Sequence, residues 1–312
     1  MQLKIGPLTF KNRLFLAPMV EVTDLPYRLI CRKAGAAMAY TEMLYISAIL
    51  HENTKTQRLM KTIPSEHPLG IQITGNNAEE FQKAIPHLRP YDVVDINCGC
   101  PSIRIIGNAA GSYLLKHPNK IANMIKILKD SGLTVTAKIR LGFKHNNVLK
   151  IAKQIEKADA DALTIHARLA HQGANIPADW RWIAKVKKTI GIPVIGNGDI
   201  FSPKHVEEML NIADGAMLAR GALGDPDIFT RTLKYLKTGK EQEVNFARNL
   251  KSFQEYLKLA KKHQVIDLQR IKYLGVNFLR NVPGASKMRN QIMQTKSLLE
   301  IQEFTKAMLE KN

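Results

Sequence analysis

The chain of 312 residues is 45% hydrophobic and 23% charged, and its 46 Lys and Arg against 27 Asp and Glu give a net charge of +19. This length and apolar content predict a sizeable core, either one large barrel or a barrel with a small extra domain. No apolar run reaches the roughly 18 residues of a membrane span, and the N-terminus has no secretory pattern. We therefore expect a cytoplasmic protein with no membrane partner.

The three cysteines argue against a disulfide framework and suit a reducing compartment. Cys98 and Cys100 lie close together, but no second Cys or His pair follows at the spacing of a zinc site. We expect no metal.

The positive charge predicts a polyanionic partner and favours a nucleic acid. Residues 237–312 carry 15 Lys and Arg against 7 Asp and Glu, so the C-terminal quarter is more basic per residue than the rest. A Lys-rich surface that only keeps the protein soluble is the alternative interpretation.

Short apolar segments alternate with longer amphipathic ones along the first 220 residues or so. The predicted strands are Leu14–Pro18, Ala39–Glu42, Leu69–Thr74, Val93–Asn97, Val135–Arg140, Ala162–His166, Pro193–Gly196 and Gly215–Leu218. The predicted helices are Leu25–Ala34, Ala78–His87, Pro118–Lys129, Val148–Lys157, Trp180–Lys188 and Pro203–Asn211, with Ile46–Leu59 less clear. Eight such units predict an α/β fold, a (β/α)8 TIM barrel. A doubly wound sheet is disfavoured because no G-x-G-x-x-G follows an early strand.

The pattern after residue 240 is helical throughout, with segments Ala247–His263, Leu268–Arg280 and Leu298–Leu309. Breaks are predicted near Val265 and at Asn281–Gly284, and the connection to the barrel at Lys237–Lys240. We therefore divide the chain into a catalytic barrel, residues 1–239, and a small all-helical domain of three or four helices, residues 240–312. Its basic charge favours RNA docking over mere capping of the barrel.

The segment DVVDINCGCPS, residues 92–102, is central to the functional prediction. Its apolar first half is typical of a strand buried on both faces, and Pro101 prevents the strand from continuing. An amide, Asn97, and a thiol, Cys100, are thus expected at the carboxyl end of a core strand, where barrels keep their active sites. The alternative is that Cys98 and Cys100 are merely small buried apolar residues.

Other strand ends add polar groups. Gly196, Gly198 and Gly221 with Arg220 follow the last two strands, where many barrels bind phosphate through backbone N–H groups. Lys138 lies in an otherwise apolar strand, and a lysine is costly to bury unless an anionic or electron-rich group receives it. A reduced flavin is one such partner, and a snorkelling lysine is the alternative.

Together these segments resemble the tRNA-dihydrouridine synthases, flavin enzymes that reduce uridine in tRNA. The resemblance rests on motifs that occur in the family's order: LAPMVEVTDLPYR (16–28), TEM (41–43), GIQITG (70–75), DINCGCPS (95–102), AAGSYLL (109–115), AKIRLG (137–142), HARLAHQGANIPADW (166–180), GNGDI (196–200) and MLARGALGDP (217–226). They cover the whole barrel. The C-terminal region matches more loosely.

The resemblance implies roles for individual residues. It implies that FMN contacts Ala17, Pro18, Met19, Gln72, Lys138, His166, Asn197, Gly198, Asp199, Ala219 and Arg220. It implies that the uracil contacts Asn97 and Arg140, that Arg168 also binds the substrate, and that Cys100 is the catalytic acid. Cys98 receives no role.

The implied reaction adds a hydride from reduced FMN to uracil C6 and a proton from Cys100 to C5, with NADPH or NADH as the electron donor. A cysteine is mostly protonated at neutral pH, so it can deliver that proton. The expected partner is tRNA, and a monomer is the expected state. Two alternatives stay open: a flavin barrel that reduces a free pyrimidine, and a tRNA-binding protein without catalysis.

Overall fold

The computed structural model describes residues 2–280 and 284–310. Its central feature is a sheet of eight parallel strands in the order β3-β10-β9-β8-β7-β6-β5-β4. The Leu16 N–H donates to the Met38 carbonyl at 3.0 Å and the Ala37 N–H to the Leu14 carbonyl at 2.7 Å, which joins β3 to the segment before β4. The sheet is therefore almost completely closed, and the predicted (β/α)8 barrel is confirmed.

All eight predicted strands are present, with ends that differ by at most three residues. Their bounds are β3 (Leu14–Leu16), β4 (Ala39–Tyr45), β5 (Leu69–Thr74), β6 (Val93–Cys98), β7 (Val135–Arg140), β8 (Ala162–His166), β9 (Val194–Asn197) and β10 (Gly215–Leu218). Every residue of β5, β6, β9 and β10 is buried, as expected for strands between a packed barrel interior and a ring of helices.

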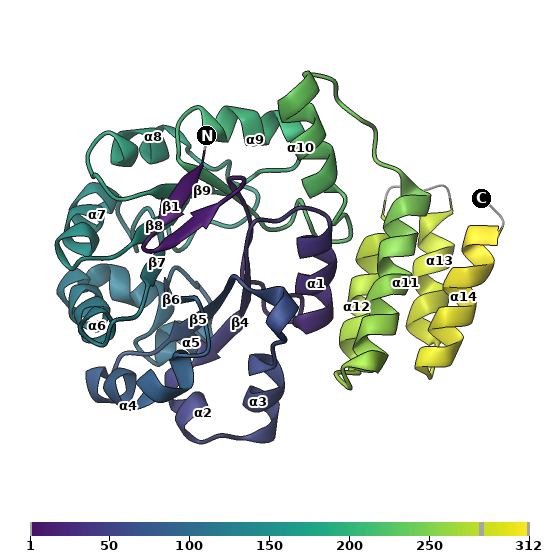
Figure 1. Cartoon of the computed structure of the whole chain (residues 1–312), viewed down its shortest axis with the longest axis horizontal. Coiled ribbons are helices and arrows are strands. Elements are labelled where there is room, and N and C mark those ends of the chain that lie inside the picture. The colour runs from purple at the N-terminus through teal and green to yellow at the C-terminus, as the bar shows by residue number, and fades with distance from the viewer. Residues whose placement is uncertain (1, 281–283, 311–312) are drawn as a thin grey trace.

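Helices surround the barrel (Figure 1). They are α1 (Leu25–Lys33), α2 (Ile46–Leu50), α3 (Thr54–Met60), α4 (Ala78–Leu88), α5 (Ile103–Gly107), α6 (Pro118–Asp130), α7 (Val148–Lys157), α8 (Arg181–Lys187), α9 (Pro203–Leu210) and α10 (Ile228–Thr238), with 3-10 turns η1 (Pro64–Glu66) and η2 (Gly111–Lys116). The unclear segment Ile46–Leu59 is thus two helices, and α5 and α10 were not predicted. The Asp24 and Ser202 side chains cap α1 and α9 by accepting from the N–H groups of Tyr27 and His205.

An antiparallel hairpin, β1 (Leu3–Ile5) and β2 (Leu8–Phe10), precedes the barrel and was also not predicted. Leu3, Ile5 and Phe10 are buried in one cluster with Phe15 and Met217, which belong to β3 and β10. The hairpin therefore covers one end of the barrel interior, whose apolar side chains would otherwise contact water.

The C-terminal region consists of α11 (Phe246–Lys262), α12 (Leu268–Phe278), α13 (Ala285–Gln294) and α14 (Leu298–Glu310). In Figure 1 this bundle lies on the α1 side of the barrel, with α13 and α14 farther from α1 than α11 and α12. This confirms helices after the barrel. α10 ends at Gly239 in the left-handed conformation, and residues 281–283 of the predicted break lie outside the described residues. Among the residues described, no helix is long and apolar enough to cross a membrane.

The helical region and the barrel meet along a buried seam between α1, α11 and α12. The Tyr256 hydroxyl donates to Asp24 at 3.0 Å, and the Tyr256 ring packs edge-on against Tyr27. The Arg270 guanidinium lies 3.0 Å from Glu42 and 3.4 Å from Asp24, and all three side chains are at most 8% exposed. An arginine of α12 is thus paired with two carboxylates of the barrel.

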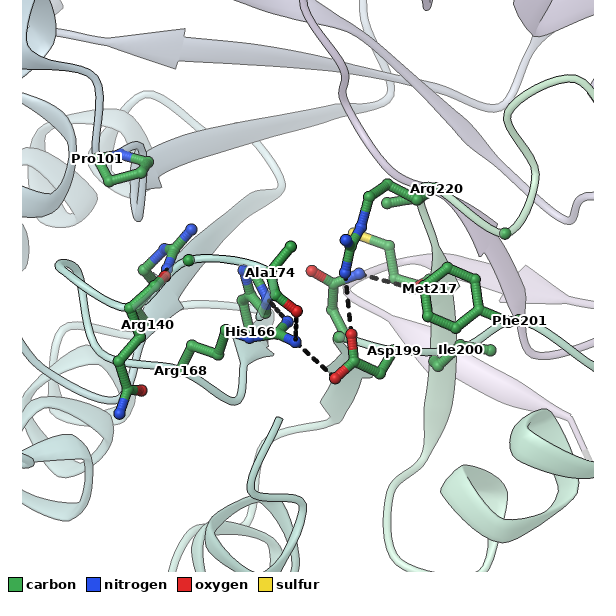
Figure 2. Close-up of a pocket in the computed structure, with 16 residues that line it drawn as sticks. Pro101, Arg140, His166, Arg168, Ala174, Asp199, Ile200, Phe201, Met217 and Arg220 are labelled. Atoms are coloured by element: carbon green, nitrogen blue, oxygen red, sulfur yellow. Dashed lines mark hydrogen bonds and ion pairs between the residues drawn. The ribbon is translucent and has the colours of Figure 1, made fainter. Parts of the chain in front are cut away.

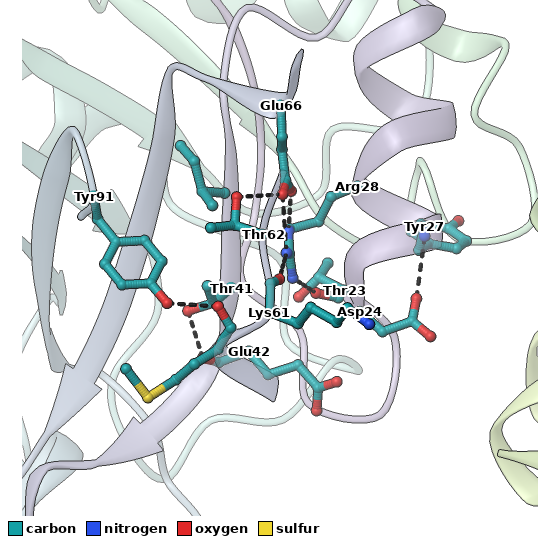
Figure 3. Close-up of polar contacts among 12 residues, drawn as sticks. Thr23, Asp24, Tyr27, Arg28, Thr41, Glu42, Lys61, Thr62, Glu66 and Tyr91 are labelled. Atoms are coloured by element: carbon teal, nitrogen blue, oxygen red, sulfur yellow. Dashed lines mark hydrogen bonds and ion pairs between the residues drawn. The ribbon is translucent and has the colours of Figure 1, made fainter. Parts of the chain in front are cut away.

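A second buried ion pair, Arg28 with Glu66, lies on the barrel side of this seam (Figure 3). Arg28 also donates to the carbonyls of Thr23 and Lys61, each at 2.9 Å, and the Thr62 hydroxyl donates to Glu66 at 2.9 Å. These contacts connect the loop after β3 to the segment before β5. The loop is therefore held from both sides, by Arg28 and by Arg270.

Candidate functional site

The loops after β6 to β10 surround a cavity of about 250 Å³ (Figure 2). Nine of the predicted site residues line it: Arg140, His166, Arg168, Asn197, Gly198, Asp199, Ala219, Arg220 and Gly221. Gln172, Phe201 and Met217 also line it and were not predicted. Pro101, the neighbour of Cys100 in the chain, is part of the wall.

The end of β6 is organised by Asn97. Its amide oxygen accepts hydrogen bonds from the backbone N–H groups of Gly99, at 3.1 Å, and Cys100, at 2.9 Å. Its amide nitrogen donates to Gln72 at 2.8 Å. Asn97 therefore fixes the turn that carries Cys100, a positioning role in addition to the substrate contact that the resemblance implies.

Cys100 is half-buried, whereas Cys98 is fully buried in the core. Burial raises the pKa of the Cys98 thiol well above its ordinary value, so it stays a neutral apolar group. The Cys100 carbonyl accepts from the Ser112 N–H at 3.0 Å, which holds the segment from its other side. Cys100 is the accessible thiol of the two.

Asp95 is a buried acid that the sequence interpretation overlooked. Its two oxygens accept from Gln72 and Thr136, each at 2.7 Å. Burial raises its pKa to about 6, although these hydrogen bonds and the charge of Lys138 act in the opposite direction. Its place in an apolar strand made it look like a plain strand residue. Its hydrogen bonds orient Gln72, and through it Asn97.

Lys138 is held inside the barrel mouth by Asn197. Its ammonium donates to the Asn197 amide oxygen at 3.1 Å, and the Asn197 amide nitrogen donates to the Met217 carbonyl at 2.8 Å. Burial lowers the pKa of Lys138 to about 8, so the group is mostly charged at neutral pH. No carboxylate is paired directly with it within the described residues. Its charge is available to an anionic or electron-rich ligand.

His166 is a neutral hydrogen-bonding group. Burial and the positive charges of Lys138, Arg140 and Arg168 lower its pKa to about 2. The Arg168 guanidinium lies 3.0 Å from His166 Nε2 and can only donate. Nε2 therefore accepts, and the ring proton is on Nδ1, which makes His166 a donor toward a ligand.

Arg168 uses all three of its nitrogens within the protein. Besides His166, it donates to the Ile176 carbonyl at 2.5 Å and to Asp199 at 2.6 Å, and its side chain is 1% exposed. Arg168 thus positions His166 and the loop after β8. Its expected contact with the substrate stays a prediction.

Arg140 donates through Nε to the Gly99 carbonyl at 2.9 Å and through Nη1 to the Leu169 and Gln172 carbonyls. Its Nη2 has no partner among the residues that the structure describes, and the side chain lines the cavity. Arg140 therefore presents a free donor, as a substrate-binding residue requires.

The loops after β9 and β10 meet at Asp199, which lies between Arg168 and Arg220 in Figure 2. Its carboxylate accepts from Arg220 at 2.9 Å and from the Ala178 N–H at 2.9 Å. Partial burial favours a higher pKa, but the hydrogen bond and charge of Arg168 prevail and hold the pKa of Asp199 below its ordinary value. Asp199 thus orients the two arginines.

Two glycines in these loops have no room for a side chain. A Cβ on Gly198, whose φ is +112°, would lie 2.9 Å from His166, and a Cβ on Gly221 would lie 2.2 Å from the Ile200 carbonyl. Within the described residues, neither backbone N–H donates to another backbone oxygen. Free N–H groups next to Arg220 suit an anion.

The loop after β3 carries Ala17, Pro18 and Met19. The Ala17 N–H donates to the Leu218 carbonyl at 2.8 Å, which brings this loop beside the end of β10. Met19 packs on the same apolar cluster as Ala17 and Ala219. The sequence-predicted residues at the ends of β3, β6, β7, β8, β9 and β10 thus converge on one face of the barrel. In the described part of the chain, no group of three or more His, Cys, Asp or Glu side chains is placed to hold a metal ion.

Solved structures with a similar fold include an old yellow enzyme homologue from Zymomonas mobilis and a morphinone reductase. The first has a TM-score of 0.56 at 12% identity and covers 78% of this chain and 93% of that chain. The second has a TM-score of 0.55 at 11% identity and covers 78% and 90%. At such low identity, the likeness shows the barrel fold alone.

Sequence comparison identifies the family. The family model described as "Dihydrouridine synthase (Dus)" matches residues 15–312. "Probable tRNA-dihydrouridine synthase 1" of Synechocystis sp. is 37% identical over 311 residues, 96% of this chain and 86% of the relative. "tRNA-dihydrouridine synthase B" of Yersinia pestis is 36% identical over 245 residues, 76% of each chain. The chain therefore belongs to the dihydrouridine synthase family of enzymes.

Proposed function

We propose that the protein reduces uridine in tRNA to 5,6-dihydrouridine with FMN as its flavin and NADPH or NADH as the electron donor. The observation that carries the proposal is the position of a half-buried thiol, Cys100, at the end of β6. It lies beside a cavity whose lining includes Arg220 and the backbone of Gly198 and Gly221, groups that suit a phosphate. Family membership supports tRNA as the substrate. We also propose that the protein is a cytoplasmic monomer and that its reaction needs no metal.

The donor set of the mouth fits FMN. Arg220 and the unpaired N–H groups of Gly198 and Gly221 suit the phosphate, and Lys138 and the neutral His166 suit the polar edge of the ring. Ala17 and Met19 with Ala219 offer an apolar surface. When bound and reduced, FMN supplies the hydride that uracil C6 receives.

The chain's own residues supply the proton and the orientation. Cys100 donates its proton to C5 and takes another from solvent after each turnover, so the atoms balance. Asn97 holds the Cys100 turn through two N–H groups, and the free Nη2 of Arg140 donates to the uracil. The uridine must leave its stack to enter the mouth, at a cost of about a few kcal/mol.

We further propose that residues 1–239 perform the chemistry and that residues 240–312 hold the tRNA body. The net positive charge of the helical region supports this division because phosphate contacts offset the cost of flipping the base. Deletion of residues 240–312 would also remove Arg270, which pairs with Glu42 beside the loop after β3, so it would disturb the barrel as well as RNA binding.

The test is mass spectrometry of unmodified tRNA after incubation with the protein, FMN and NADPH. We expect one or more uridines to gain two hydrogens. Cys100→Ala is expected to lower the rate about 10²- to 10⁴-fold, the usual contribution of a general acid, while FMN stays bound. Reduction of free uracil in place of tRNA would favour the free-pyrimidine enzyme, and equal activity of Cys100→Ala would remove the assigned role of Cys100.

A further inference from the structure

The quarter of the barrel around β6 and β7, residues 96–155, has an unusual excess of positive charge. It contains 10 Lys and Arg and one acidic residue, Asp130, whereas residues 240–312 contain 14 against 7. In Figure 1, α6 and α7 of this quarter face away from α11–α14. The basic charge is therefore not confined to the helical region.

Most of these cations have no counter-ion. Lys129 pairs with Asp159 and Asp161, but six exposed lysines of this quarter form no ion pair within the described residues. They are Lys116, Lys120, Lys126, Lys144, Lys150 and Lys153. Their mutual repulsion has no benefit to the fold, and an anionic partner would relieve it.

Some of these cations adjoin aromatic rings at the mouth of the barrel. The Lys116 ammonium lies 3.6 Å from the ring centroid of Tyr113 and 4.9 Å from that of Phe143. The two rings are 6.3 Å apart and nearly perpendicular, and the His117 ring is 5.3 Å from Tyr113. Both aromatic rings are half-buried, so part of their surface contacts solvent.

This group borders the candidate active site. Phe143 comes three residues after Arg140, and His171 Nδ1 lies 3.4 Å from the Phe143 carbonyl. The next residue, Gln172, accepts from Arg140 and lines the cavity with it. We name the group Tyr113, Lys116, His117, Phe143, Lys144 and His171 the aromatic rim.

We propose that the aromatic rim binds the single-stranded RNA segment next to the target uridine, with bases stacked on the rings and phosphates paired with Lys116 and Lys144. The inference rests on the proposed function. Rings interleaved with cations are the usual surface for unpaired nucleotides, because every base has a π-face and every nucleotide a phosphate. The contact with Tyr113 already restrains the Lys116 ammonium, so little further entropy is lost when a phosphate binds.

The RNA would then span the mouth, with the helical region on one side and the rim on the other. This arrangement gives Lys116 and Lys144 the anionic partner that they lack in the protein, whereas Arg168 and Arg220 of the cavity already pair with Asp199. An acidic protein segment could also satisfy the lysines, but it would leave the exposed ring surfaces without a stacking partner.

The experiment measures the Kd of full-length, FMN-loaded protein for an unmodified tRNA transcript at a series of salt concentrations. We expect Phe143→Ala to weaken binding about tenfold or more, the usual loss of one stacked base. Lys116→Ala with Lys144→Ala should reduce the slope of log Kd against log salt by about 2, one for each phosphate contact. If the alanine variant does not fold, Phe143→Leu takes its place. It keeps an apolar side chain but has no ring to stack on a base, so it should weaken binding as well.

Lys126→Ala is the matched control. Lys126 is also an exposed lysine of the same quarter. It lies one turn before Lys129, which pairs with Asp161 at the amino end of β8, away from the mouth. It should change neither the Kd nor the salt slope. Rim variants that bind tRNA as the Lys126→Ala variant does would overturn the proposal.

Two further outcomes separate this proposal from the proposed function. Wild-type protein that binds tRNA through the rim but reduces no uridine would overturn the function and leave the rim as an RNA surface. If polyglutamate binds as tightly as tRNA, with the same loss in Phe143→Ala, the rim is a site for an acidic protein.

Discussion

Positive charge is buried and paired at the seam between the barrel and the helical region, whereas it is exposed and unpaired in the β6–β7 quarter. At the seam, Arg270 is 8% exposed and lies within 3.6 Å of Glu42, Asp24 and Glu21. In the β6–β7 quarter, lysines such as Lys144 and Lys150 are exposed and have no acidic partner in the described structure. Both regions contain cationic side chains, and they differ in whether those side chains are buried and paired.

This difference teaches what each set of charges does. A buried charge is costly unless it is paired, so removing one partner leaves the other charge buried and uncompensated. An exposed charge is screened by water and salt, so it contributes little to folding and stays available for a partner. The seam charges are therefore structural, and the exposed lysines are free to bind.

The largest expected effect on stability is at the seam. Arg270→Met should lower the free energy of unfolding by about 3–5 kcal/mol, because Asp24 and Glu42 are left buried without their counter-ion. Urea denaturation measures it. The control is Arg248→Met, which removes an ion pair to Asp227 from a side chain that is 53% exposed and should cost about 1 kcal/mol or less. Equal losses would contradict the comparison.

The Arg270→Met deficit should also depend on pH. Burial raises the pKa values of Asp24 and Glu42, and Arg270 opposes the rise. Without Arg270 both pKa values rise further, so the folded state binds protons that the unfolded chain does not. Stability of the variant then improves as the pH falls from 7 toward 5, and its deficit relative to wild type shrinks. A deficit that grows over this range would refute the explanation.

The barrel mouth should respond to pH in the opposite sense. The pKa of His166 is about 2 in the folded state and about 6.5 when unfolded, so only the unfolded chain binds its proton below pH 6. Compared with His166→Asn, wild type should lose up to about 1.4 kcal/mol of stability per pH unit in that range. Denaturation of both proteins between pH 5 and 7 measures it. Parallel curves would show that His166 is not held neutral.

The smallest effect is expected in the β6–β7 quarter. Lys150→Ala with Lys153→Ala removes two exposed lysines of α7 that have no acidic partner among the described residues. The change should alter the free energy of unfolding by no more than about 0.5 kcal/mol. A slight gain at low salt that disappears at high salt would fit relief of repulsion. A fall of several kcal/mol in the free energy of unfolding would show that these exposed lysines stabilise the fold, as the seam charges do.

The local patterns predicted the repeated units well. Strands such as Leu69–Thr74 and Val135–Arg140 coincide with β5 and β7 because a buried strand is a short apolar run. The hairpin β1–β2 escaped prediction because its strands, LKI and LTF, each have a charged or polar central residue and form no apolar run, unlike the equally short β3, LFL. α10 (Ile228–Thr238) was overlooked because no helix was assigned between the last predicted strand and residue 240. The strand-end residues converge as expected for a parallel barrel, since its carboxyl ends share one face.

The sequence by itself determined the barrel, the family and the kinds of groups at the mouth, because all of these follow from local periodicity and short motifs. Only the tertiary structure decided which groups face one another. It showed that Asp95 orients Gln72, that Asp199 holds Arg168 and Arg220, and that Arg270 reaches Glu42. Such pairs lie far apart in the chain and meet only after the barrel closes and the helices pack against it. No local sequence pattern shows which of these distant residues will pair. The energy of each pair depends on its burial, which exists only in the folded molecule.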